Sequence, residues 1–238
     1  MPLVYSPLNG DEWKEPFELF PKTGFLMLQS GGELTADDLF MQDAARAQMG
    51  AQGYEIKTAI DLRRSGDYLH KITKMIMGCG FGVAVFSSDT PSRTIGNIFF
   101  EVGYCLALGK PVILVVKGGS KVMPSDFVRS EWVEFKPGSE EQFQQDLAGQ
   151  INGLTQQSAF FELLADAAYE AEEVDHELVV ERYKRAALIN SSEHSLQRLR
   201  DTELAVRTAE VTPSFATHRR SLLENVKQFL RLFPNNAA

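Results

Sequence analysis

The segment comprising residues 81–116 places the strongest constraint on the fold of this chain. Residues 81–87 form an apolar run, and residues 87–92 form a polar loop. Residues 94–108 have a helical pattern, and residues 112–116 form a second run, which is β-branched. We expect Gly109 to end the helix in a left-handed conformation, and Pro111 prevents the helix from continuing. The segment therefore predicts a strand–helix–strand unit whose two parallel strands are covered on both faces.

Strands and helices are expected to alternate through the first two thirds of the chain. Apolar runs predict further strands at residues 24–29, 54–60 and 131–135. Helical periodicity predicts further helices at residues 37–49, 68–77 and 139–154. Because strand–helix–strand crossovers are right-handed, this alternation predicts an α/β fold with a doubly wound parallel sheet. The strand order that we expect is flavodoxin-like.

The last third of the chain has a different pattern. It has almost no β-branched runs, and its periodicity predicts four helical segments, at residues 160–172, 175–190, 193–209 and 213–232. These segments predict a small all-α domain. The sequence thus predicts an irregular N-terminal arm at residues 1–22, an α/β domain at residues 23–156 and a C-terminal helical domain at residues 157–238.

Composition excludes several classes of function. The formal net charge of −8 argues against a general nucleic-acid binder, which needs clustered Lys and Arg side chains. No apolar run approaches the length of a membrane span, and the start lacks a secretory pattern, so we expect a cytoplasmic protein without a membrane partner. Cys79 and Cys105 lie in apolar segments and have no metal-ligand spacing. We therefore expect reduced thiols, no metal and no cofactor.

The carboxyl ends of parallel strands are where such sheets bind ligands. In this chain the loop at Ser87, Ser88 and Asp89 follows one strand, and the next helix carries Glu101. Asn97, Glu101 and Tyr104 share one face of that helix because they are spaced by four and three residues. A solvated surface role for Glu101 is the alternative, but the neighbouring aromatic residues make this a poor place for a merely solvated charge.

Two other strand-end loops are expected at the same edge of the sheet. Ser30, Gly31 and Gly32 would let backbone N–H groups approach a ligand, although a plain turn is the simpler explanation of two glycines. The loop from Asp61 to Gly66 carries Arg63, which could hold a phosphate, and a solvated surface arginine is the alternative. Both loops are predicted to converge with the loop that follows residue 87.

The central sequence resembles a known superfamily. Residues 59–101, AIDLRRSGDYLHKITKMIMGCGFGVAVFSSDTPSRTIGNIFFE, resemble the middle of a TIR domain. The adjoining run NIFFEVGYCLALGKPVILVV resembles the nucleoside 2-deoxyribosyltransferases, and also the bacterial TIR-like nucleotide-binding proteins of antiphage systems. The resemblance covers about residues 24–152. It departs from an ordinary TIR domain at the opening FLMLQSGG and at Phe99-Phe100, where a Trp-Cys pair is usual.

The resemblance implies a chemistry and a set of site residues. It implies N-glycosidic cleavage of NAD or a related nucleotide, with NAD as substrate and Glu101 as the catalytic carboxylate stabilising an oxocarbenium-like state. Asp89 or Asp61 would protonate a neutral leaving group. Other positions would contact the substrate, namely Ser30, Gly31, Gly32, Asp61, Arg63, Ser87, Ser88, Arg93, Asn97 and Tyr104.

Two alternative functions remain open at this point. The first is nucleoside or deoxynucleotide N-glycosyl transfer or hydrolysis, and the second is a non-catalytic nucleotide sensor or scaffold. The resemblance also implies a defence or signalling context and self-association into a homo-oligomer. The C-terminal helices are the expected place for self-association or for a protein partner.

Overall fold

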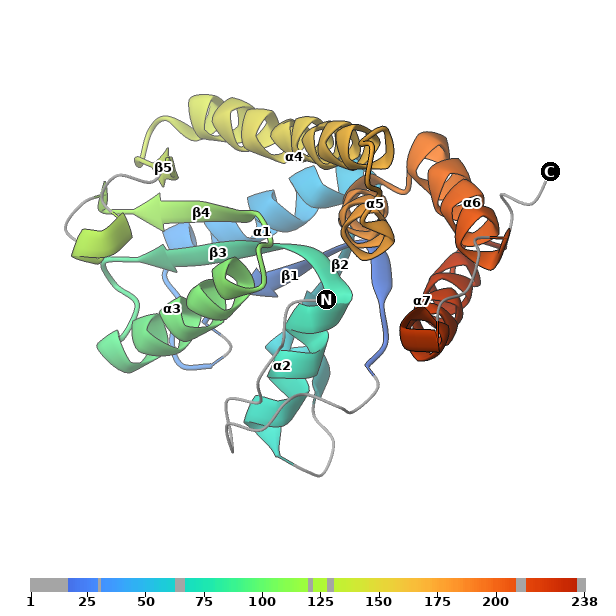
Figure 1. Ribbon diagram of the computed structural model, residues 1–238. Helices are drawn as coiled ribbons and strands as arrows, with labels where there is room; N and C mark the ends of the chain where they lie inside the picture. The colour runs from blue at the N-terminus through green and yellow to red at the C-terminus, as the bar shows by residue number, and fades with distance from the viewer. Residues whose placement is uncertain are drawn as a thin grey trace. The chain divides into compact units, whose positions relative to one another are not determined.

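The computed structural model describes residues 17–29, 31–62, 67–119, 122–127, 131–208 and 213–234, without the side chains of 61, 62, 126 and 213–218. A five-stranded, all-parallel sheet lies at the centre of the first part of the chain (Figure 1). Its strand order is β2-β1-β3-β4-β5. The strands are β1 (Phe20–Met27), β2 (Glu55–Thr58), β3 (Cys79–Ser87), β4 (Val112–Lys117) and β5 (Val133–Phe135). The predicted α/β fold with a parallel sheet is therefore confirmed.

Helices follow the strands along the chain. The structure has α1 (Ala36–Ala51), α2 (Tyr68–Gly78), α3 (Ser92–Ala107), α4 (Glu140–Tyr169), α5 (His176–Asn190), α6 (Glu193–Thr208) and α7 (Pro213–Leu230). Short 3-10 turns occur at Ala59–Leu62 and Ser125–Phe127. Gly109 ends α3 with a φ of 67°, in the left-handed conformation that the sequence predicts.

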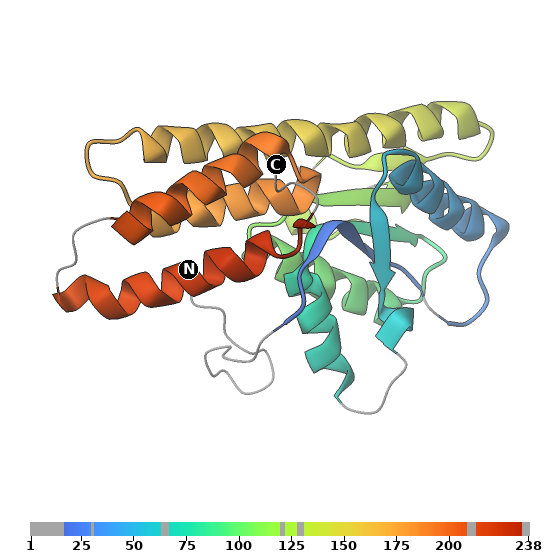
Figure 2. The ribbon, with the colours of Figure 1, turned by 90° about the vertical axis from the view of Figure 1, so that its right-hand side faces the viewer.

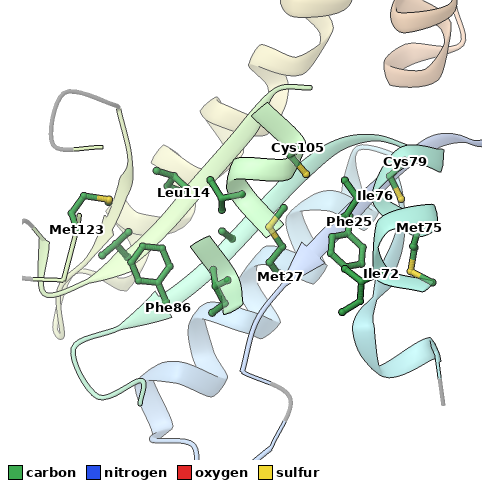
Figure 3. Close-up of a cluster of buried hydrophobic side chains, with 14 residues drawn as sticks. Phe25, Met27, Ile72, Met75, Ile76, Cys79, Phe86, Cys105, Leu114 and Met123 are labelled. Carbon is green, nitrogen blue, oxygen red and sulfur yellow. The ribbon is translucent and has the colours of Figure 1, made fainter. Parts of the chain in front are cut away.

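The two faces of the sheet are covered by different helices because side chains alternate along each strand. Ala84 and Phe86 of β3 join a buried apolar cluster with residues of α2 and α3, such as Ile76 and Val102 (Figure 3). Phe81 is also in β3, but its side chain lies on the opposite face of the sheet from those of Ala84 and Phe86. Its ring contacts the ring of Tyr54, just after the end of α1, at a centroid distance of 5.0 Å. The apolar β3 run is thus buried on both sides, as a central parallel strand requires.

Close packing on the α1 side requires glycine at position 24. A Cβ atom there would lie 2.5 Å from Cε of Met49 in α1 and 2.6 Å from the ring of Phe81. These distances are shorter than any van der Waals contact, so a larger residue would displace the end of the Met49 side chain and the Phe81 ring.

Some elements have boundaries that differ from the sequence-based expectation. β1 begins at Phe20, inside the segment predicted to be irregular, and Pro21 is tolerated there because it stands at the start of the strand. β2 ends at Thr58, and Ala59–Leu62 forms a 3-10 turn, where the sequence predicted strand up to residue 60 and a loop after it.

The prediction of two helices at 139–154 and 160–172 is wrong, because α4 is one continuous helix of 30 residues. The intervening residues, from Thr155 to Ala159, contain neither glycine nor proline, so nothing stops the helix there. Two compact units divide inside this helix, between Leu154 and Thr155.

The second unit is helical in its described residues. Helices α5, α6 and α7 pack against one another, and both α5 and α6 are bonded to the last turns of α4 (Figure 2). There Asp166 accepts hydrogen bonds from the Tyr183 hydroxyl and from Nε2 of His194, and it pairs with Nε of Arg198 at 3.3 Å. In the described part of the chain, no helix has both the length and the apolar character needed to cross a bilayer.

Candidate functional site

Three strand ends bring polar side chains together at the carboxyl edge of the sheet. Nζ of Lys117, the last residue of β4, lies 2.9 Å from Oδ2 of Asp37 in α1 and 2.8 Å from Oδ2 of Asp89, which follows β3. Asp38 and Ser87 lie beside this bridge. We call Asp37, Asp38, Ser87, Asp89 and Lys117 the carboxyl-edge cluster.

The first turn of α1 is fixed by a capping box. The Thr35 hydroxyl accepts a hydrogen bond from the Asp38 backbone N–H at 3.1 Å, and the Asp38 carboxylate accepts one from the Thr35 N–H at 3.0 Å. Burial alone would raise the pKa of Asp38, but hydrogen bonds from Ser87 and Thr35 outweigh it and lower the pKa. Asp38 is therefore an ionised carboxylate that ties α1 to the end of β3.

The loop after β3 is held by its own side chains. The Ser87 backbone N–H donates to Oγ1 of Thr90 at 2.9 Å, and the Asp89 N–H donates to Oγ of Ser87 at 3.1 Å. The Ser88 N–H donates to the Lys117 carbonyl at 3.0 Å. Ser87 and Thr90 are buried, whereas Ser88 and Asp89 are exposed. These hydrogen bonds hold the loop in one conformation, in which Ser88 and Asp89 are accessible to a ligand.

Lys117 is the cation of the cluster. Hydrogen bonds and charge interactions with Asp37 and then Asp89 raise its pKa above the ordinary value, so it is always protonated at neutral pH. Gly118 follows with a φ of +97°, and a Cβ atom there would lie 3.2 Å from the Cβ of Ser88. A glycine is required at this position both by the backbone conformation and by the close approach of the Ser88 loop.

Glu101 is the tenth of the 16 residues of α3 and is buried, with 8% of its surface exposed. No described residue forms a hydrogen bond or an ion pair with its carboxyl group. Burial raises the pKa of this group to about 7, because the charged form loses its hydration without a compensating partner. At neutral pH Glu101 therefore exists both as a carboxylate and as a carboxylic acid.

Tyr104 lies one turn beyond Glu101 and shares its lack of partners. Its hydroxyl oxygen is buried and forms no hydrogen bond. Burial raises the pKa of Tyr104 to about 12, so the hydroxyl keeps its proton and remains a potential donor. The ring stacks on Phe100 at a centroid distance of 6.4 Å. We call Glu101 and Tyr104 the α3 pair, since buried polar groups without partners are uncommon in proteins.

Helix α3 runs back along the sheet from the carboxyl edge. The ring of Phe99 lies 5.1 Å from that of Phe86, the residue that precedes Ser87. Glu101 comes two residues later, which corresponds to about 3 Å along the helix axis. The α3 pair therefore begins close to the level at which β3 ends, although no described hydrogen bond or ion pair joins Glu101 to the carboxyl-edge cluster.

The other predicted site residues have varied surroundings. Gly31 and Gly32 are exposed, and the loop that holds them is fastened by Nε2 of Gln29, which donates to the Gly31 carbonyl at 2.8 Å. Arg93 is exposed in the first turn of α3, and Asn97 is exposed and not hydrogen-bonded to Glu101. Three predicted residues cannot be placed by their side chains: Ser30 and Arg63 lie outside the described residues, and Asp61 is described only in its backbone.

Sequence reasoning missed Asp37, Asp38 and Lys117. Each had a recognisable signal, because the two aspartates open a helix directly after a strand-end loop, and Lys117 directly follows a β-branched strand. Among the described residues, no group of three or more His, Cys, Asp and Glu side chains could hold a metal ion. No protein-family model matches the sequence, and a comparison with curated proteins finds no match either.

Proposed function

We propose that this protein cleaves the N-glycosidic bond of NAD or a related nucleotide, with Glu101 as the reacting carboxylate. The observation that carries the proposal is the α3 pair on one helix: Glu101, whose side chain is 8% exposed and has no ion pair or hydrogen bond to a described residue, and the fully buried Tyr104 hydroxyl, which has no hydrogen bond. A buried ionisable group with a perturbed pKa is typical of a functional site, because structural groups of this kind are normally hydrogen-bonded.

The proposed reaction breaks the bond between C1′ of the ribose and the ring nitrogen of the base. The bonding electron pair leaves with nicotinamide, whose ring is cationic before cleavage and neutral afterwards, so no proton donor is needed. The Glu101 carboxylate stabilises the positive charge that develops on C1′ and the ring oxygen. Water then adds to C1′ and gives up one proton, which yields the free ribosyl product.

Tyr104 and the carboxyl-edge cluster have proposed roles in binding. The Tyr104 hydroxyl donates a hydrogen bond to the Glu101 carboxylate or to a ribose oxygen once the substrate is present. Ser88 and Asp89, which are exposed, contact the ribose hydroxyls, and Arg93 contacts the diphosphate. Asp89 acts as a proton donor only after it leaves its ion pair with Lys117, so we assign it to binding rather than to proton transfer.

The finer features of the fold belong to the same proposal. The strand order β2-β1-β3-β4-β5 supports a flavodoxin-like, doubly wound sheet of the TIR-like kind. We further propose that the helices after residue 155 form a separate domain that promotes self-association or binds a protein partner. Deletion of residues 158–238 tests this role, and an unchanged oligomeric state together with unchanged activity would contradict it.

Transfer to or from a neutral base is the second candidate function. A group with a pKa of about 7 can also donate a proton at neutral pH, which is what a neutral purine or pyrimidine requires as it leaves. The two candidates differ in the form of Glu101 that reacts. Cleavage of NAD needs the carboxylate and should become faster as pH rises through about 7, whereas expulsion of a neutral base needs the acid and should become slower.

The experiment that tests the proposal measures release of free base from NAD and from a panel of nucleosides and nucleotides. Wild type is compared with Glu101→Gln and with Glu55→Gln, which makes the same chemical change at an exposed residue of β2. We expect release that is abolished by Glu101→Gln and kept by Glu55→Gln. Saturable nucleotide binding without release from any substrate would contradict the proposal and favour a non-catalytic sensor.

A further inference from the structure

The second unit contains a hollow between α6 and α7 that the proposed function does not use. Its volume is about 330 Å³, which is at the lower end of the range for small-molecule sites. Both helices and the turn after α7 contribute to its lining, with Arg200, Glu203, Lys227, Leu230, Arg231, Phe233 and Pro234. The two helices lie side by side in Figure 2.

The charges around this hollow are mainly positive. Arg200, Lys227 and Arg231 contribute three cations, of which Arg200 is itself paired with Glu193 at 4.0 Å, and Glu203 is the only acidic residue among those that line the hollow. Glu203 is itself paired with Arg207, one turn farther along α6, so little of its negative charge remains to balance the other side chains. The hollow is thus a cationic site in a chain whose formal net charge is −8.

Two of the three cations repel each other along α7. Lys227 and Arg231 are four residues apart, a spacing at which like charges on a helix repel each other. No described residue forms an ion pair with either of them. The helix dipole favours cations near the end of α7, but it does not explain why Arg200 reaches the same hollow from α6. An anion bound between the three side chains would relieve this repulsion.

The remainder of the lining is apolar. Leu230, Phe233 and Pro234 form this part, next to the cations. The Phe233 ring is supported by Phe229 at a centroid distance of 5.4 Å. A site lined both by guanidinium groups and by an aromatic ring suits a molecule that has a phosphate at one end and a less polar body at the other.

We propose that the hollow between α6 and α7 binds a small phosphorylated molecule, whose phosphate contacts Lys227, Arg231 and Arg200. The volume limits the ligand to about the size of a mononucleotide. This site is independent of Glu101 and holds whether or not the chain cleaves an N-glycosidic bond.

Isothermal titration of the full chain tests the proposal, with inorganic pyrophosphate, ribose 5-phosphate, AMP and adenosine as probes. The test variants are Lys227→Gln and Arg231→Gln, singly and together. The matched control is Arg220→Gln, which removes a cation from α7 at a side chain that is 84% exposed. Glu101→Gln is included so that binding at the proposed catalytic site is recognised separately.

We expect saturable binding of at least one phosphorylated probe and none of adenosine. Affinity should fall by about tenfold to a hundredfold for each cation removed, since a charged hydrogen bond contributes roughly 1.5–3 kcal/mol. Arg220→Gln should bind as wild type does, and any binding that Glu101→Gln alone changes is assigned to the proposed catalytic site. AMP binding more tightly than pyrophosphate would place the base on the Phe233 side, and equal affinities would assign recognition to the phosphate alone.

A second measurement needs no substitution. Acetylation of Lys227 in the wild-type chain, followed by mass spectrometry, should be slowed by the probe that binds, while acetylation of the other lysines is unchanged. Absence of saturable binding of every phosphorylated probe at millimolar concentration would overturn the proposal. So would an affinity that is unchanged in the double variant, or adenosine binding as tightly as AMP.

Discussion

Replacement of Glu101 by glutamine should stabilise the α/β unit at neutral pH, even as it removes the proposed activity. The side chain keeps its shape and loses only the ability to ionise. Glu101 is 8% exposed and has no described partner, so its charged form is buried without compensation. Glutamine does not carry that cost, which is why we expect the variant to gain stability where the wild-type carboxyl group is ionised.

The size of the effect follows from the pKa of the group. Burial raises this pKa from 4.5 to about 7, a difference that corresponds to about 3 kcal/mol at roughly 1.4 kcal/mol per pH unit. Because the folded pKa is raised, the wild type has its full stability below pH 4.5 and loses it progressively as pH rises to about 7. The variant should therefore gain about 3 kcal/mol relative to wild type across that window.

Urea denaturation at several pH values, followed by tryptophan fluorescence, measures this gain. Trp132 packs against the buried cluster of the α/β unit, before the division between Leu154 and Thr155, so its signal follows unfolding of that unit. Glu55→Gln is the control, and we expect its difference from wild type to stay constant over the same pH range. If the difference for Glu101→Gln is also constant, the carboxyl group is not buried as described.

Three further substitutions test other contacts. Tyr104→Phe removes a hydroxyl that has no partner, so we expect the free energy of unfolding in urea to change by no more than about 1 kcal/mol while base release slows. A loss above about 2 kcal/mol would indicate that the hydroxyl has a hydrogen-bond partner. Lys117→Met removes the cation that bridges Asp37 and Asp89, and it should lower the free energy of unfolding by about 1 kcal/mol at low salt and by less at high salt. Thr35→Ala removes the α1 cap and should lower the melting temperature through a loss of about 1 kcal/mol, with Thr35→Ser restoring most of it.

The architecture of the α/β unit could be predicted from the sequence because its strands are short, apolar and separated by clear helix stops. Gly109 and Pro111 fixed the end of α3, and the β-branched run after them fixed β4. The continuous helix α4 could not be predicted in the same way. Residues 155–158, TQQS, are polar enough to resemble a linker between two helices, and only the absence of a glycine or proline after Leu154 indicates that the helix continues.

The candidate site could be predicted only in part. The loop at Ser87 and the helix that carries Glu101 follow from strand and helix periodicity, since the ends of parallel strands are where such loops meet. The bridge that Lys117 forms to Asp37 and Asp89 spans residues far apart in the sequence. Its existence depends on the register between β3 and β4 and on the placement of α1, which local patterns do not determine.

The rate of nicotinamide release from NAD, measured against pH for wild type and Glu101→Gln, tests the central claim most directly. We predict a wild-type rate that rises to a plateau as pH increases through about 7, in step with ionisation of Glu101, and no detectable release by the variant. Release that persists in Glu101→Gln, or a wild-type rate with no inflection near that pH, would contradict the assignment of Glu101 as the reacting carboxylate.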